Sequence, residues 1–181
     1  MICFIGSYQD LLNQSNIDSC KKCVPGKYSK VGMGQINETS CTSCVAGKYS
    51  ISEPGAIDEN VCKACSAGKY SDAGAGQASE LTCKNCDAGK YSDAGVGQTS
   101  VSTCKNCEAG KYSTAGNTSC TVCEKGYYCP GGIDRIACIA GKYSMHENQT
   151  SALTCIPCNA GKYSDSVASF ICNNCKIGKY S

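Results

Sequence analysis

Cysteines are the residues of this chain whose type and spacing could do chemistry. The chain has 19 of them among 181 residues, and most lie in pairs with the spacing CxxC. Thiols at this spacing bind zinc, exchange disulfides with other proteins, or form structural disulfides. The order in which the pairs recur decides between these uses.

Five of the pairs recur with a fixed period of 21 residues. They are Cys20/Cys23, Cys41/Cys44, Cys62/Cys65, Cys83/Cys86 and Cys104/Cys107, and further pairs follow at Cys120/Cys123, Cys155/Cys158 and Cys172/Cys175. The phrase Gly-Lys-Tyr-Ser begins three residues after the second cysteine of most pairs, first at Gly26. Self-similarity at a fixed period predicts a tandem-repeat protein.

The spacing of neighbouring pairs also fits a zinc ribbon, for example with Cys20, Cys23, Cys41 and Cys44 as ligands. That use would consume the pairs two at a time and would produce a period twice as long. The residues that follow successive pairs are instead the same, without alternation. We therefore expect structural disulfides and no metal ligands.

Catalysis is not expected from this sequence. A thioredoxin-like site needs a βαβ pattern around its CxxC, and no pair has one. No nucleophile–base pair, carboxylate dyad or phosphate-binding loop stands out from the repeats. We predict that the protein is not an enzyme, with no catalytic residues and no cofactor.

Disulfides that follow the repeat join the second cysteine of one pair to the first cysteine of the next, although spacing alone permits other connectivities. The rule predicts Cys3–Cys20, Cys23–Cys41, Cys44–Cys62, Cys65–Cys83, Cys86–Cys104, Cys107–Cys120, Cys138–Cys155 and Cys158–Cys172. The interrupted repeat is expected to close as Cys123–Cys129, followed by a linker over 130–137. Cys175 is expected to pair within a further repeat of a longer polypeptide. Each long bridge stabilises the fold by roughly 3 kcal/mol.

The elements that position these cysteines must be small. Leu, Ile, Val and Phe make up only 26 of the 181 residues, too few for one large core. The net charge of +2 favours neither nucleic acid nor an anionic membrane as a partner. No apolar run is long enough to span a bilayer.

Each repeat divides into an opening half, a turn and a returning half. Aspartate and glycine mark the turn over 72–76 and again over 93–97. The Tyr-Ser segments and Leu81-Thr82 or Ser102-Thr103 are the predicted strands. The expected fold is small and disulfide-rich: an elongated tandem array of short β-hairpin modules with little regular secondary structure and no large core.

The repeat gives the predicted module boundaries. The modules are 1–22 (a partial first repeat), 23–43, 44–64, 65–85, 86–106, 107–122 (a short repeat), 123–137 (a variant repeat and linker), 138–157, 158–174 and 175–181 (a truncated repeat). We call the first cysteine of each module its opening cysteine. The cysteine to which it is predicted to bond is the closing cysteine.

The repeated tyrosine lies five residues after each opening cysteine, where its ring is expected to cover the disulfide and form a miniature core. The lysine before it points to the opposite face of a strand. Lys48, Lys69, Lys90 and Lys111 are therefore expected to form a solvated row. His146 is the single histidine and receives no role.

Four N-glycosylation sequons begin at Asn13, Asn37, Asn117 and Asn148. All lie in the returning part of a repeat, and none interrupts Gly-Lys-Tyr-Ser. This placement predicts an exposed rim that carries N-linked sugars. Sequons and a high cysteine content together favour an extracellular or cell-surface location.

The Cys-x-x-Gly-x-Tyr opening and the Cys-x-x-Cys close resemble the cysteine-rich ephrin-receptor-like repeat, a relative of the tumour-necrosis-factor-receptor cysteine-rich modules. The stretch 123–132 is similar to a common variant of that repeat, and the resemblance covers nearly the whole chain. It implies a protein of receptor ectodomains, protist surface coats or large structural proteins similar to algal flagellar hairs.

The near-identity of the repeats predicts a structural component of an extracellular fibre, filament or surface coat. Its expected partners are copies of itself or other extracellular structural proteins, together with covalent glycans. The alternative is a ligand-binding or adhesive receptor ectodomain, with Tyr127, Tyr128 and Arg135 of the variant repeat as its contact site. A bend caused by Pro130, Gly131 and Gly132 is the simpler interpretation of that repeat.

Overall fold

Very short strands and single turns of helix form the fold. The computed structural model describes residues 2–10 and 16–178. The strands are β1 (Ser7–Tyr8), β2 (Lys21–Lys22), β3 (Lys27–Tyr28), β4 (Thr42–Ser43), β5 (Lys48–Tyr49), β6 (Lys63–Ala64), β7 (Lys69–Tyr70), β8 (Lys84–Asn85), β9 (Lys90–Tyr91), β10 (Lys105–Asn106), β11 (Lys111–Tyr112), β12 (Thr121–Val122), β13 (Tyr127–Tyr128), β14 (Ile136–Ala137), β15 (Lys142–Tyr143), β16 (Ile156–Pro157), β17 (Lys162–Tyr163) and β18 (Asn173–Asn174). The 3₁₀ helices are η1 (Ile17–Ser19), η2 (Glu38–Ser40), η3 (Glu59–Val61), η4 (Glu80–Thr82), η5 (Val101–Thr103) and η6 (Ala152–Thr154).

The strands form two-stranded antiparallel hairpins. Most pair the Lys-Tyr of the repeated phrase with the two residues that follow the closing position, and β1 (Ser7–Tyr8) and β13 (Tyr127–Tyr128) pair in the same way. In the β3–β4 hairpin, for example, Lys27 lies opposite Ser43 and Tyr28 opposite Thr42. The same pairing joins β1–β2, β5–β6, β9–β10, β11–β12, β13–β14, β15–β16 and β17–β18. The predicted fold class, a disulfide-rich series of hairpins with little regular secondary structure, is confirmed.

The predicted returning strands Leu81-Thr82 and Ser102-Thr103 are wrong. Both segments lie in 3₁₀ helices, η4 and η5. A side chain just before each helix causes the turn: Ser79 Oγ accepts a hydrogen bond from the Leu81 N–H at 3.2 Å, and Ser100 Oγ caps η5 in the same way. Such caps favour a helical turn over an extended strand.

The opening half of each module contains a tight turn with glycine at its third position. In Val24-Pro25-Gly26-Lys27, the Lys27 N–H donates to the Val24 carbonyl at 3.0 Å, and Gly26 has φ +84°. A positive φ at this position is typical of a type II turn and favours glycine. The turn directs the Lys-Tyr strand back along the disulfide.

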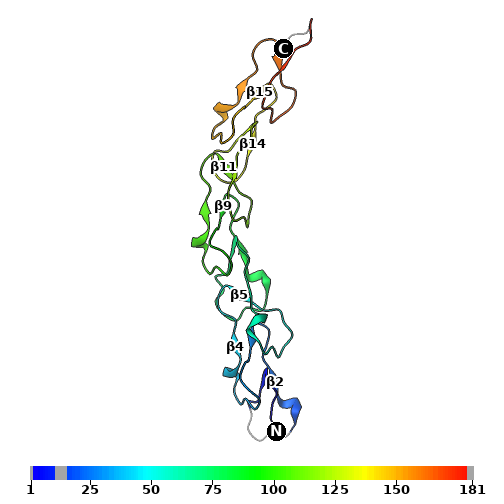
Figure 1. Cartoon of the computed structure of the whole chain (residues 1–181), viewed down its shortest axis with the longest axis vertical. Helices are drawn as coiled ribbons and strands as arrows, with labels where there is room; N and C mark the ends of the chain where they lie inside the picture. Colours follow the sequence, from blue (N-terminus) through cyan, green and yellow to red (C-terminus); the bar gives the residue numbers. More distant parts are fainter. Residues whose placement is uncertain (1, 11–15, 179–181) are drawn as a thin grey trace. The chain divides into compact units, whose positions relative to one another are not determined.

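The chain divides into two compact units. Unit 1 comprises Met1–Lys84 and Ala94–Thr103, and unit 2 comprises Asn85–Asp93 and Cys104–Ser181. Within unit 1, strands β2, β4 and β5 follow one another in chain order (Figure 1). Among the described residues, no helix has the length and apolar character needed to cross a membrane.

Backbone hydrogen bonds connect each module to the next within a unit. The Gly55 N–H donates to the carbonyl of opening Cys23 at 2.8 Å, and the Ser29 N–H donates to Ala56 at 2.9 Å. In unit 2, the Asn148 N–H donates to opening Cys123 at 2.8 Å. These bonds use main-chain atoms and therefore recur although the side chains differ.

Glycines of the repeated phrase also contact the module after the next. A Cβ atom added to Gly26 would lie 2.4 Å from the Gly76 carbonyl oxygen, and one added to Gly47 would lie 2.2 Å from that of Gly97. In unit 2 the same relation joins Gly126 to Ala168, at 2.0 Å. Module contacts therefore extend beyond the nearest neighbour, which the repeat pattern did not predict.

Alanine substitutions at three glycines of unit 1 separate these effects. Gly32 has ordinary φ and no atom within 4 Å of an added Cβ, Gly74 has φ +75° but open space, and Gly26 has both a positive φ and the close carbonyl. We expect Gly32→Ala to leave the thermal unfolding midpoint nearly unchanged. Gly74→Ala should destabilise by about 1 kcal/mol, and Gly26→Ala by clearly more. Equal effects at Gly26 and Gly74 would contradict the contact.

Ala168 carries the strain that glycine avoids at the equivalent turn position. Its φ is +60°, and its N–H donates to the opening Cys138 carbonyl at 2.8 Å. Ala168→Gly should therefore stabilise the oxidised protein by roughly 0.5 kcal/mol, because relief of strain exceeds the added unfolded-state entropy. Calorimetry of this variant and of Ala160→Gly, a control without positive φ, checks the sign. An equal loss of stability in both would exclude the strain.

Candidate functional site

Nine disulfides hold the described part of the chain together. They are Cys3–Cys20, Cys23–Cys41, Cys44–Cys62, Cys65–Cys83, Cys86–Cys104, Cys107–Cys120, Cys123–Cys129, Cys138–Cys155 and Cys158–Cys172, the same pairs that the repeat predicts. Cys175 is partly exposed and has no disulfide partner among the described residues. Within the same residues, no group of three or more His, Cys, Asp or Glu side chains could hold a metal ion.

Cystines and serines make up most of the small buried interior. The serine of the repeated phrase is at most 6% exposed in each described copy from Ser29 to Ser164. Its N–H donates to the next module, as in Ser50 to the Gln77 carbonyl at 2.9 Å. The hydroxyl oxygens of Ser29, Ser71 and Ser92 have no hydrogen-bond partner in the described structure. The constant serine in the phrase was the signal for this buried position, which the sequence analysis missed.

The tyrosines contribute less to the interior than predicted. Tyr49 is buried, at 8% exposure, and burial raises the pKa of its hydroxyl. Tyr28, Tyr70, Tyr91, Tyr112 and Tyr143 are half-buried, and Tyr163 is 39% exposed. The cystine and the serine already fill the small interior of a module, so little room is left for a tyrosine ring. Most of the tyrosines therefore lie at the edge of the interior.

The predicted row of solvated lysines is only partly solvated. Lys48, Lys69, Lys90 and Lys111 are all half-buried. Lys90 of this row pairs with Asp87 at 4.0 Å, and other lysines form shorter ion pairs, such as Lys84 with Asp72 at 2.8 Å and Lys105 with Asp93 at 2.7 Å. The hydrogen bond from Lys84 lowers the pKa of the Asp72 carboxyl. The Lys84 and Lys105 pairs join the turn to the returning strand within one module.

The variant module 123–137 is a complete hairpin rather than a short loop and a linker. Ile136 and Ala137 of β14 pair with β13, and the Cys138 N–H donates to Gly126 at 2.8 Å, as Cys44 does to Gly26. The predicted linker over 130–137 is therefore wrong in its last residues. The sequence did not reveal this strand because Arg135, and not a cysteine, stands three residues before Cys138.

The variant module relocates the disulfide. Cys129 occupies the position of the buried phrase serine, since its N–H donates to Gln149 of the next module at 2.8 Å, as Ser29 does to Ala56. Arg135 occupies the position of the closing cysteine, directly before the returning strand. The opening Cys123 thus bonds to Cys129 at the end of the first strand of the hairpin. Both cysteines are fully buried.

Arg135 has partners inside the protein. Its guanidinium forms an ion pair with Glu124 and lies over the Tyr127 ring, 4.5 Å from the centroid. The Tyr112 ring of the preceding module lies at 5.8 Å. These contacts bring together Tyr127 and Arg135 of the predicted alternative contact site, while Tyr128 lies opposite Ile136.

The described sequons lie outside the buried interior. Asn37 is exposed, and its Oδ1 caps η2 by accepting from the Thr39 N–H at 3.0 Å. The cap uses the amide oxygen only. The amide nitrogen, the atom that carries an N-linked sugar, takes no part in the cap. Asn148 is exposed and Asn117 half-buried. Asn13 lies outside the described residues.

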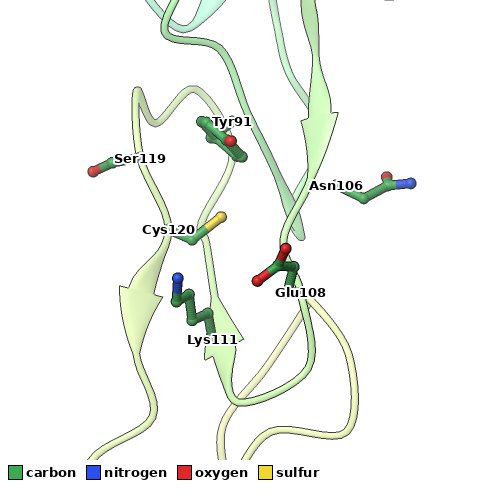
Figure 2. Close-up of a pocket in the computed structure, with 6 residues that line it drawn as sticks. All are labelled: Tyr91, Asn106, Glu108, Lys111, Ser119 and Cys120. Atoms are coloured by element: carbon green, nitrogen blue, oxygen red, sulfur yellow. The ribbon is translucent and has the colours of Figure 1, made fainter. Parts of the chain in front are cut away.

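A hollow of about 320 Å³ lies between modules 86–106 and 107–122, in unit 2. It is lined by Tyr91, Asn106, Glu108, Lys111, Ser119 and Cys120. In Figure 2 the Tyr91 ring borders one end, and the Glu108 carboxylate and Lys111 ammonium face the space from the other. The side chains of Asn106 and Ser119 point outward.

A swap of the disulfide tests the equivalence of the variant and ordinary modules. Cys129→Ser should leave Cys123 unpaired and lower stability by about 2 kcal/mol. Adding Arg135→Cys should recover a disulfide, Cys123 to position 135, and much of that stability. Peptide mapping and thermal unfolding measure both. Pairing that is no better than in a Cys129→Ser/Ile133→Cys control would show that position 135 is not a closing position.

The candidate site is thus a series of disulfide-closed hairpins with a hollow at one module junction. Comparison with known proteins adds no family assignment to this description: no protein-family model and no curated protein matches the chain.

Proposed function

We propose that this chain is a non-enzymatic structural component of an extracellular fibre, filament or surface coat. One observation carries the proposal: main-chain hydrogen bonds and close glycine contacts of the same kind link successive modules in each unit. Contacts of this kind add a module without requiring a new set of side chains. Repeat proteins gain stability in this way, from each module and its interfaces.

The disulfides indicate an oxidising environment. Nine bridges persist only where thiols are not kept reduced. We propose secretion to the cell surface or beyond, and N-linked sugars at Asn13, Asn37, Asn117 and Asn148. The exposed Asn37 and Asn148 side chains support this proposal, because a glycan requires a surface position.

We also propose that the modules are ephrin-receptor-like repeats used for construction. The partners are then copies of the same chain or other extracellular structural proteins. Module 123–137 favours the receptor alternative less than its sequence suggested. Its Arg135 is held by Glu124 and Tyr127, so the departure from the repeat has an internal structural role.

Electron microscopy of native material tests the proposal. Filaments or a coat with a regular axial repeat are the expected result, because identical junctions produce a periodic object. The same material carrying Gly47→Ala should show fewer or shorter assemblies, since the added Cβ meets the Gly97 carbonyl. Gly32→Ala, whose added Cβ meets nothing within 4 Å, serves as the control.

The receptor alternative makes a different prediction for the same material. It requires dispersed molecules that bind a soluble partner, with binding lost in Arg135→Ala. That result, without any periodic assembly, would overturn the structural role.

A further inference from the structure

The hollow between modules 86–106 and 107–122 combines an aromatic ring with two ionic groups. Tyr91 of β9 is half-buried, so part of its ring is accessible. Lys111 of β11 and Glu108 in the turn before it belong to the next module. The phenol ring offers an apolar face, the carboxylate accepts hydrogen bonds, and the ammonium donates them.

The polar side chains of Glu108, Lys111 and Asn106 in the hollow have no partner among the described residues. Among the described residues, the side chains of Glu108, Lys111 and Asn106 form no ion pair and no hydrogen bond to other side chains or to the backbone. Six other acidic side chains of the described residues have a lysine partner, as Asp93 has in Lys105. Glu108 and Lys111 therefore remain available for a ligand.

Lys105 supports the ring from outside the hollow. Its ammonium lies 5.9 Å from the Tyr91 centroid and is held by Asp93 at 2.7 Å. Lys105 does not line the hollow. Tyr91 is thus held by a lysine of its own module, and it lines the hollow between this module and the next.

A second hollow occupies the equivalent junction in unit 1. It measures about 250 Å³ and includes Tyr28, Lys48, Glu59 and Asn60. Tyr28 and Lys48 stand at the same repeat positions as Tyr91 and Lys111. Here the carboxylate is that of Glu59 in η3, and it forms an ion pair with the Lys30 ammonium at 2.8 Å. The arrangement of tyrosine and lysine therefore recurs in a separate unit, whereas the free carboxylate is specific to unit 2.

We propose that the Tyr91–Glu108–Lys111 hollow binds a neutral pyranose sugar. The C–H face of a pyranose suits an aromatic ring, and its hydroxyls donate to a carboxylate and accept from an ammonium. The opposite charges of Glu108 and Lys111 offset each other, which disfavours a polyanionic chain. The volume lies at the small end of ligand sites and suits one ring.

Affinity at one junction is weak, and function requires many junctions. A single ring on an open hollow corresponds to a Kd of about 1 mM. Copies of this junction on neighbouring chains of an assembly would bind an oligosaccharide more tightly through multivalency. This role goes beyond a structural scaffold, because it connects the scaffold to a carbohydrate.

Saturation-transfer difference NMR on the whole oxidised chain tests the site. The probes are a mannose trisaccharide, an N-acetylglucosamine trisaccharide and a sulfated heparin oligosaccharide. Transfer to the C–H protons of a neutral probe is expected, with a Kd of about 1 mM. Tyr91→Ala and Glu108→Gln should each weaken that binding roughly fivefold.

Glu147→Gln is the matched control, because Glu147 is exposed and does not line the hollow. It should bind as the unmodified protein does. An unchanged disulfide map establishes that Tyr91→Ala is folded, and Glu108→Gln gives an independent test at a surface side chain. Absence of transfer from both neutral probes at about 10 mM, equal binding by all variants, or binding of the sulfated probe alone would each overturn the proposal.

The sugar has two possible sources, which deglycosylation separates. If glycans of this chain or its copies fill the hollow, enzymatic removal of N-linked sugar should raise the affinity for the added probe. If the ligand is a free matrix polysaccharide, deglycosylated and native protein should bind equally. Either result supports the site, and Tyr91→Ala should reduce binding in both.

Discussion

The cystine that closes each module is the constraint on which the rest of the structure depends. A two-residue strand pair is too small to persist in water without support, and this chain buries few large side chains. Bonding the opening cysteine to the closing position fixes both arms of a hairpin at once. Cys23, Cys44 and Cys65 are each only 1% exposed, so the bridge is also the centre of the interior. The turn, the buried serine and the edge tyrosine all take their positions from it.

Small residues are the second requirement, because the modules approach one another through the main chain. Gly26 lies against the Gly76 carbonyl, where a side chain has no room, and the phrase serine fills the space beside the cystine. A larger residue at either place would separate the modules. The constancy of Gly-Lys-Tyr-Ser is therefore explained mostly by its first and last residues, whereas its lysine and tyrosine lie at the edge and are free to face solvent or a ligand.

Module 123–137 meets the same constraint by a different route. Its second cysteine stands at the serine position, and the hairpin remains paired although Arg135 replaces the closing cysteine. The guanidinium then stacks on Tyr127 and pairs with Glu124. A departure that preserves the strand pairing and the junction is more consistent with continuity of a scaffold than with a separate recognition domain.

The nine bridges, the hairpin class and the glycine turns could be predicted from the amino-acid sequence, because a strict repeat displays its cysteines and its turn glycines at fixed positions. The strand register, the caps at Ser79 and Ser100, the hairpin in 123–137 and the contact of Gly26 with Gly76 became visible only in the folded chain. Leu81-Thr82 has strand character by composition, yet a neighbouring hydroxyl turns it into a helix. Contacts between modules two apart could not be predicted from the repeat, since the constant glycine does not indicate which carbonyl oxygen lies against it.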